Sequence, residues 1–131
     1  MNEHDRERIY LQIVKHTKKS LEEIGTAAES LTPQQTDLYR TQLSALYGLL
    51  TDELARLEQE KALLWLEIKK NHEGVARAKP LSDAATDAHY DATPNGQRRI
   101  ELKFMLKAME KMISALAGRM HRLNQEFIME R

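Results

Sequence analysis

One apolar seam near the end of the sequence constrains the fold most. From residue 102 onward, large apolar side chains recur at steps of three and four residues, which is the spacing of one face of an α-helix. The seam consists of Leu102, Met105, Met109, Met112, Leu116, Met120, Leu123 and Phe127. It predicts an amphipathic helix over residues 97–131 whose apolar side is buried against other helices.

Start signals predict two further long helices. Asn2 is a good N-cap for an N-terminal helix over residues 1–31, in which Gly25 is a weak point. A long helix over residues 33–73 should start at Thr32-Pro33-Gln34-Gln35. In this run, Thr32 is the capping residue, Pro33 occupies the first helical position and Gln35 can complete a capping box.

The segment 75–96 interrupts this pattern of long helices. Ser82 is a suitable N-cap for a short helix from Asp83 to about Tyr90. Thr93-Pro94 repeats the cap-plus-proline start of Thr32-Pro33, and Asn95-Gly96 suggests a turn, so the last helix should begin here or just after. The chain has only five glycines and three prolines, and no segment shows strand alternation. We therefore expect one all-α domain over residues 1–131, a long-helix hairpin or bundle with a coiled-coil-like seam, containing three long helices and one short helix.

The predicted helix lengths favour an oligomer. The second and last helices would be about 60 and 50 Å long, whereas a compact chain of this size is roughly 35–40 Å across. We expect the overhanging part of the seam to contact other copies of the chain. A monomeric three-helix bundle with a bent second helix is the alternative. The predicted interface residues are Met105, Met109, Met112, Leu116, Met120, Leu123 and Phe127.

The sequence does not contain the residues that several kinds of catalytic or metal-binding site require. There are no cysteines, which excludes disulfides, thiol catalysis and cysteine zinc sites. The five histidines are not spaced as metal ligands on a helix, and there is no glycine-rich phosphate loop or nucleophile beside a base at motif spacing. We expect no enzyme activity, metal or cofactor. The polar N-terminus and the lack of a long apolar run predict a cytoplasmic protein without a signal peptide or membrane span.

A basic face lies opposite the seam on the last predicted helix. It comprises Lys103, Lys107, Lys111 and Arg122, preceded by Arg98 and Arg99, and the apolar side chains of Ile100 and Phe104 fall on the same face. Cations that follow phosphates and a ring that stacks a base suit single-stranded nucleic acid. The alternative is an ordinary solvated face, with Phe104 covered by the short helix.

A second basic cluster surrounds the end of the second helix. It comprises Lys69, Lys70, Arg77 and Lys79. Loops at helix ends often carry binding residues, which makes this cluster a second candidate for nucleic-acid binding. Lysines at a helix C-terminus also stabilise the helix dipole, so a purely structural role is the alternative.

From about Ala45 to Glu126 the order of parts resembles phage recombination mediators of the UvsY type. The resemblance lies in the Glu-, Lys- and Gln-rich helix 57–65, the loop His72-Glu73-Gly74, the acidic helix introduced by residues 79–84, and the long amphipathic C-terminal helix. It implies single-stranded DNA binding, ring-like oligomers held by the C-terminal helix, and help in loading a RecA-type recombinase onto DNA covered by single-strand-binding protein. The family pattern carries over to Lys69 and Lys70, and implies the host cytoplasm as location if a phage encodes the chain.

A purely structural role is the competing hypothesis. The formal net charge is zero, and the second helix carries an acidic run of Asp52, Glu53, Glu58 and Glu60. These features favour a helical adaptor or phage assembly chaperone that acts only through protein–protein contacts.

Overall fold

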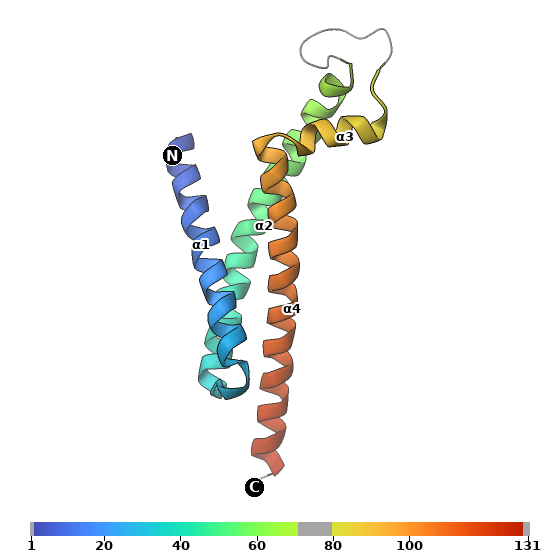
Figure 1. Ribbon diagram of the computed structural model, residues 1–131. Coiled ribbons are helices and arrows are strands. Elements are labelled where there is room, and N and C mark those ends of the chain that lie inside the picture. Colours follow the sequence, from blue (N-terminus) through green and yellow to red (C-terminus); the bar gives the residue numbers. More distant parts are fainter. Residues whose placement is uncertain (1, 71–79, 130–131) are drawn as a thin grey trace. The chain divides into compact units, whose positions relative to one another are not determined.

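A computed structural model describes residues 2–70 and 80–129 of the chain (Figure 1). Its elements are α1 (Glu3–Ala27), the short 3-10 turn η1 (Ala28–Ser30), α2 (Pro33–Lys70), α3 (Asp83–Asp91) and α4 (Pro94–Met129). These ranges contain no strand, so the all-α prediction is confirmed for the part of the chain described. The predicted stretch 71–73 of the second helix, and the loop as far as residue 79, lie outside the described residues.

The predicted caps are present at three helix starts. The side chain of Asn2 accepts a hydrogen bond from the Asp5 amide at 2.8 Å. Thr32 and Gln35 form a reciprocal capping box, with bonds of 3.0 and 3.1 Å between each backbone amide and the other side chain. Ser82 accepts from the amide of Ala85 at 3.1 Å. Each contact satisfies a helix-start amide that has no partner within the helix.

The start of α4 follows the predicted Thr93-Pro94 signal and not the predicted bound at residue 97. Residues 95 and 96 are helical, and α4 begins at Pro94 rather than at residue 97. Thr93 explains the earlier start, because its hydroxyl accepts from the Gly96 amide at 3.0 Å and donates to the Tyr90 carbonyl at 2.6 Å. Gly96 is buried at this corner, where an added Cβ would lie 2.0 Å from the Tyr90 carbonyl oxygen. The expected Asn95-Gly96 turn is therefore part of a helix start. Glycine is required at position 96 because any side chain there would collide with the Tyr90 backbone.

The end of α1 also differs from the prediction. The helix passes through Gly25 and ends at Ala27, and η1 follows, so the N-terminal helix is shorter than the predicted range 1–31. An added Cβ on Gly25 would meet no atom within 4 Å, so this glycine lies in open space.

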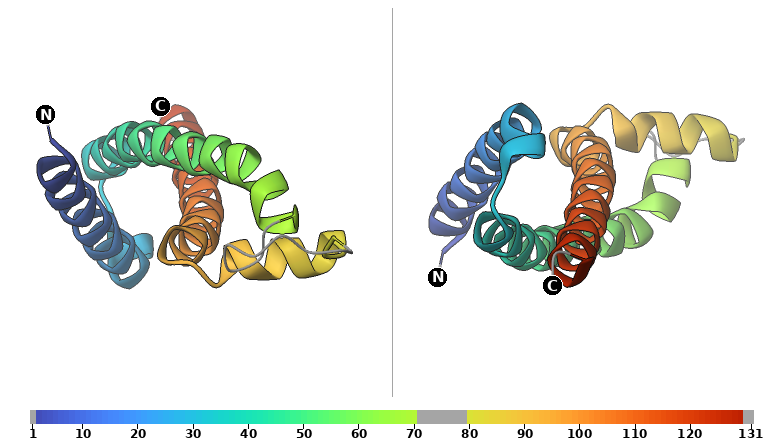
Figure 2. Two further views of the ribbon diagram at one scale, coloured as in Figure 1. Left: turned by 90° about the horizontal axis from the view of Figure 1, so that it is seen from above. Right: turned by 90° about the horizontal axis from the view of Figure 1, so that it is seen from below.

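The chain divides into two compact units. Unit 1 is Met1–Leu50 with Lys107–Arg131, and unit 2 is Thr51–Leu106. In unit 1, α1, the first part of α2 and the last part of α4 surround a common core (Figure 2). This core contains Ile24, Leu31, Leu43, Leu50, Met109 and Leu116, all fully or almost fully buried. Arg119 of α4 donates to the carbonyl of Leu31 at 2.6 Å and to that of Glu29 at 3.1 Å.

Threonines also occupy buried positions in both units. Thr17 and Thr36 in unit 1 and Thr86 in unit 2 have no solvent exposure. Each hydroxyl donates at 2.8 Å to the carbonyl four residues earlier in the chain. The polar atom is therefore satisfied locally, and the methyl group is available for packing.

In unit 2, α3 packs beside the second part of α2 and leads into the first part of α4. Leu57, Tyr90, Leu102 and Leu106 form its apolar core. The Tyr90 hydroxyl donates to the Leu57 carbonyl at 3.2 Å. The pKa of Tyr90 is raised, mainly by burial and to a smaller extent by the nearby Glu60 carboxylate. None of the helices in the described ranges has the length and apolar character needed to cross a membrane.

Candidate nucleic-acid interface

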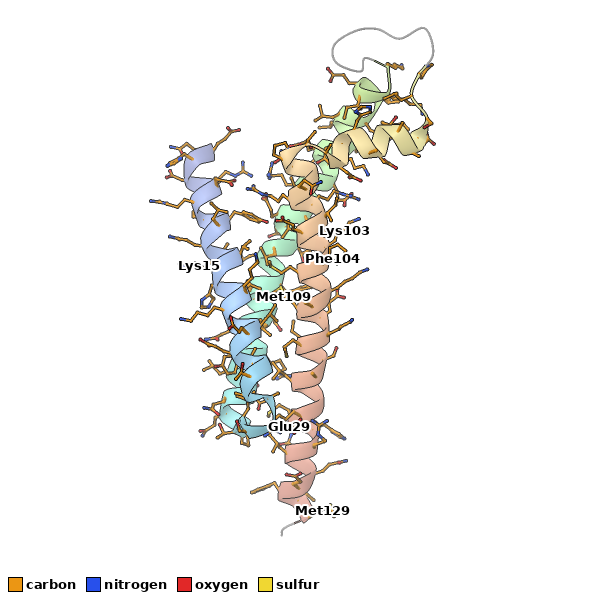
Figure 3. All side chains as sticks on the ribbon, viewed as in Figure 1. Lys15, Glu29, Lys103, Phe104, Met109 and Met129 are labelled. Atoms are coloured by element: carbon orange, nitrogen blue, oxygen red, sulfur yellow. The ribbon has the colours of Figure 1, made fainter. Side chains whose placement is uncertain are left out.

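Phe104 is an exposed aromatic residue on α4. It is 71% exposed in unit 2, and Figure 3 shows it next to the labelled Lys103. The alternative in which the short helix covers Phe104 is therefore wrong. Neighbouring Ile100 is half-buried. An exposed ring beside a cation is an arrangement that can stack a nucleic-acid base and contact its phosphate.

Lys107 and Lys111 belong to unit 1. Both are exposed, and because they lie four residues apart on α4 they share one face of the helix. Among the ion pairs within residues 2–70 and 80–129, none involves either lysine. Their charges are available to solvent anions.

The two arginines of the basic face have a different environment. The Arg99 side chain is only 13% exposed, and its Nε donates to Oε1 of Glu58 at 2.6 Å. Arg98 lies 3.7 Å from Glu53, and Lys103 lies 3.6 Å from Glu58. These pairs connect α4 to α2 within unit 2, so the arginines have a structural role in this conformation.

The Glu58 carboxyl shows the effect of these cations on an acid. Burial acts to raise its pKa, but the hydrogen bond and charge of Arg99, together with Lys103, lower the pKa below its ordinary value. Arg56 is held similarly in α2, where its hydrogen bond to Glu53 raises the arginine pKa. The basic face is therefore partly neutralised by acids of α2.

The second basic cluster is only partly described. Lys69 forms an ion pair with Asp83 of α3, and its ammonium lies 4.8 Å from the centre of the Trp65 ring. Lys70 is exposed. The predicted site residues Arg77 and Lys79 lie outside the described residues. Of this cluster, the structure thus places Lys69 against the acidic short helix and Lys70 at the surface.

The contacts of α3 bring the predicted Lys69 together with Lys61 and Trp65, which the sequence interpretation did not select as binding residues. Lys61, Trp65 and Lys69 follow each other at four-residue spacing on α2 and form what we call the Lys–Trp–Lys face. Lys61 pairs with Asp87 at 3.2 Å, and the Trp65 indole donates to the same carboxylate at 3.1 Å. The hydrogen bond from Trp65 has the largest effect on the pKa of Asp87, and it lowers this pKa together with the hydrogen bond from Lys61. The matching four-residue spacing of Asp83 and Asp87 was the sequence signal for this pairing.

The predicted interface residues divide by burial. Met109 and Leu116 are 0% and 3% exposed within the chain itself and form part of the core of unit 1. Met105, Met112, Met120 and Leu123 are half-buried, whereas Phe127 is exposed. Beyond Leu123, every described residue of α4 is exposed, as far as the labelled Met129 in Figure 3.

Within the described ranges, no three His, Cys, Asp or Glu side chains gather as a metal site would require. Comparison with family models, with characterised proteins and with solved structures gives no match.

Proposed function

We propose that this chain is a non-enzymatic protein that binds single-stranded DNA and acts as a recombination mediator. The observation that carries the proposal is Phe104, a large aromatic side chain that is 71% exposed next to Lys103. Leaving such a ring in water gains nothing for folding, whereas stacking on a base would bury it. The assistance in loading a RecA-type recombinase rests on the resemblance to UvsY-type mediators alone.

The chemistry of the proposed binding is independent of base sequence. A ring stacks on any base, and lysines contact phosphates, so affinity should fall as salt rises. In unit 1, Lys107 and Lys111 offer phosphates a contact of their own, since neither is engaged in any of the described ion pairs. Arg98 and Arg99, which are paired with acids, are not needed for this contact.

Replacing Phe104 tests the stacking. We expect Phe104→Ala to weaken binding of a labelled oligo-dT by roughly 5- to 150-fold, because one stacked base contributes about 1–3 kcal/mol. Fluorescence anisotropy at low salt measures the affinity. Leu63→Ala is the matched control, since Leu63 is 75% exposed but belongs to α2. Equal effects of the two substitutions, or no binding by the wild type, would contradict the proposal.

Neutralising two lysines tests the phosphate contacts. Lys107→Gln with Lys111→Gln should reduce the slope of log affinity against log salt by about 1.4, which is the counterion release expected from two contacts on single strands. Lys15→Gln with Lys18→Gln makes the same charge change on exposed residues of α1 and should leave the slope unchanged. The proposed role of the two α4 lysines fails if both pairs have the same effect.

A helical adaptor that binds only proteins is the second candidate. Exposed leucines on α2 favour it, because Leu63 and Leu66 lie three residues apart on one face and both are exposed. Such apolar side chains are typical of protein contact surfaces. This candidate predicts no affinity for DNA at low salt, so the anisotropy titration separates the two functions.

Self-association forms part of both candidates. It is supported by the end of α4, where Ile128 and Met129 are exposed and follow the seam. Met109 and Leu116 are already buried within unit 1, so we place the contact between copies after Leu123 rather than along the whole predicted interface.

A further inference from the structure

Three aspartates on α3 each face a cation of unit 2. Asp83, Asp87 and Asp91 are spaced four residues apart and form the acidic face of α3. Asp83 pairs with Lys69 and Asp87 pairs with Lys61, at the two ends of the Lys–Trp–Lys face. Asp91 lies 3.8 Å from a guanidinium nitrogen of Arg99 on α4.

The surface beneath this acidic face has the composition of a single-strand binding site. On α2, an aromatic ring lies between two lysines at one-turn intervals, and such a face can stack a base and contact the phosphates on either side of it. The lysine side chains are largely covered, with 18% of Lys61 and 23% of Lys69 exposed. The acidic carboxylates occupy the positions that phosphates would take.

The two ends of α3 are held differently. At its C-terminal end, Tyr90 is buried in the core and the corner to α4 is closely packed at Gly96. At its N-terminal end, the side chains of Asp83 and Asp87 are respectively 79% and 50% exposed, Thr86 between them is buried, and the Leu81 amide donates to the Lys69 carbonyl at 3.1 Å. Ion pairs whose acidic partners are this exposed are individually weak and are screened by salt. A polyanion can therefore compete for the lysines without disrupting the Tyr90 anchor.

We propose that α3 is an autoinhibitory helix whose acidic face competes with single-stranded nucleic acid for the Lys–Trp–Lys face of α2. The ligand class rests on the proposed function, but the site is separate from Phe104. Nucleic acid displaces α3 from Asp83 to Asp87, which exposes Thr86, then stacks on Trp65 and pairs its phosphates with Lys61 and Lys69. The corner at Tyr90 stays in place.

Removing the two carboxylate charges tests this proposal. Asp83→Asn with Asp87→Asn should raise the affinity for labelled oligo-dT by about tenfold or more at low salt, because two cations become available to phosphates. Asp37→Asn with Asp52→Asn is the matched control, since it removes the same charge from exposed residues of α2. Adding Lys61→Gln and Lys69→Gln to the first variant should abolish its gain.

Trp65 provides a second readout, because it is the single tryptophan of the chain. In the Asp83→Asn, Asp87→Asn variant its emission should shift to the red as the indole loses its carboxylate partner. Oligo-dT should then quench this emission. Circular dichroism checks that the variant remains helical, and Asp83→Asn alone is a milder variant, because that carboxylate is the more exposed of the two.

Three results would overturn the proposal. The first is unchanged DNA affinity in a folded variant whose Trp65 emission has shifted. The second is an equal gain in the Asp37→Asn, Asp52→Asn control, which would show that the gain is not particular to the Lys–Trp–Lys face, since Asp37 is itself paired with Arg40. The third is a gain of affinity for poly-L-glutamate but not for oligo-dT, which would indicate an acidic protein partner.

The tests also separate this inference from the proposed function. An effect of Phe104→Ala without a gain in the aspartate variant contradicts only the role of α3. Binding that appears only after the aspartates are replaced supports the role of α3 and contradicts the site at Phe104.

Discussion

Gly96 lies at a corner of unit 2 where backbone meets backbone. A Cβ at this position would approach the Tyr90 carbonyl oxygen to 2.0 Å and the Asp91 Cα to 2.7 Å. These are backbone atoms, which cannot rotate away as a flexible side chain can. Glycine is required at this position because there is no room for a side chain, although alanine would ordinarily be preferred within a helix.

Gly96→Ala should therefore destabilise the protein. Helix propensity would favour alanine by about 1 kcal/mol, but forcing a methyl group into a filled space typically costs about 1–3 kcal/mol or more. We expect a net loss of about 1–2 kcal/mol in the free energy of unfolding, measured by urea denaturation.

Gly48→Ala is the control for this prediction. It lies inside α2, and an added Cβ there would meet nothing within 4 Å. It should stabilise the protein by up to about 1 kcal/mol. If both substitutions stabilised the protein, the close packing at the α3–α4 corner would be disproved.

At the scale of the element, α3 is attached through a carboxylate whose charge depends on pH. Asp87 faces Lys61 and Trp65 of α2, and Arg99 of α4 acts on it by charge. The other acids of its own face are Asp83 and Asp91. Because these partners lower the pKa of Asp87 in the folded state, its contribution to docking is complete above the ordinary pKa of 3.8. That contribution is lost as pH falls through the lower, folded pKa.

Acid should thus release the first turns of α3. We expect the Trp65 emission to shift to the red as pH falls below about 4, the ordinary aspartate range, in the wild type. In Asp87→Asn the emission should already be shifted at pH 7 and change little on acidification. Circular dichroism recorded in parallel separates the release of α3 from general unfolding. The prediction would be refuted if the wild-type emission shifted only at the pH at which the helix signal is lost.

Helix starts were predictable from the sequence because capping is local. Asn2, Thr32 with Gln35, and Ser82 each bond to an amide three residues away, so a short stretch of sequence contains the whole signal. The start of α4 has the same kind of local signal, because the Thr93 hydroxyl accepts from the Gly96 amide. The bound at residue 97 was wrong because Asn95-Gly96 is also a common turn sequence.

The candidate site was less predictable than the fold. The exposure of Phe104 agreed with its place opposite the seam. The neutralisation of Arg99 by Glu58 did not follow from the sequence, since the partners are 41 residues apart and meet only through packing of α4 on α2. Helical periodicity tells which residues share a face, but not which charge of another helix lies opposite.

At the scale of the whole molecule, the end of α4 predicts the state of association. Ile128 and Met129 are 68% and 84% exposed. We expect light scattering to give a mass above the 15.2 kDa of one chain. Ile128→Ser with Met129→Ser should lower the mass to that of the monomer, because it removes the apolar surface that we propose as the contact with a second copy.

The control for association replaces other exposed leucines. Leu11→Ser with Leu38→Ser removes a similar amount of apolar surface from α1 and α2 and should leave the mass unchanged. A monomeric wild type would exclude self-association, and loss of association in both variants would exclude the end of α4 as its particular site.

The buried threonines have a consequence for assembly. Thr17 and Thr36 lie in the core of unit 1, yet each hydroxyl bonds to a carbonyl of its own helix or cap. Taking these helices apart would break neither bond, and only apolar contact would be lost at these positions. The same helix from another molecule would satisfy these sites equally well. The polar groups of these threonines therefore do not distinguish a neighbouring helix of the same chain from the same helix of another copy. One barrier to the exchange of helices between copies of the chain is thereby absent.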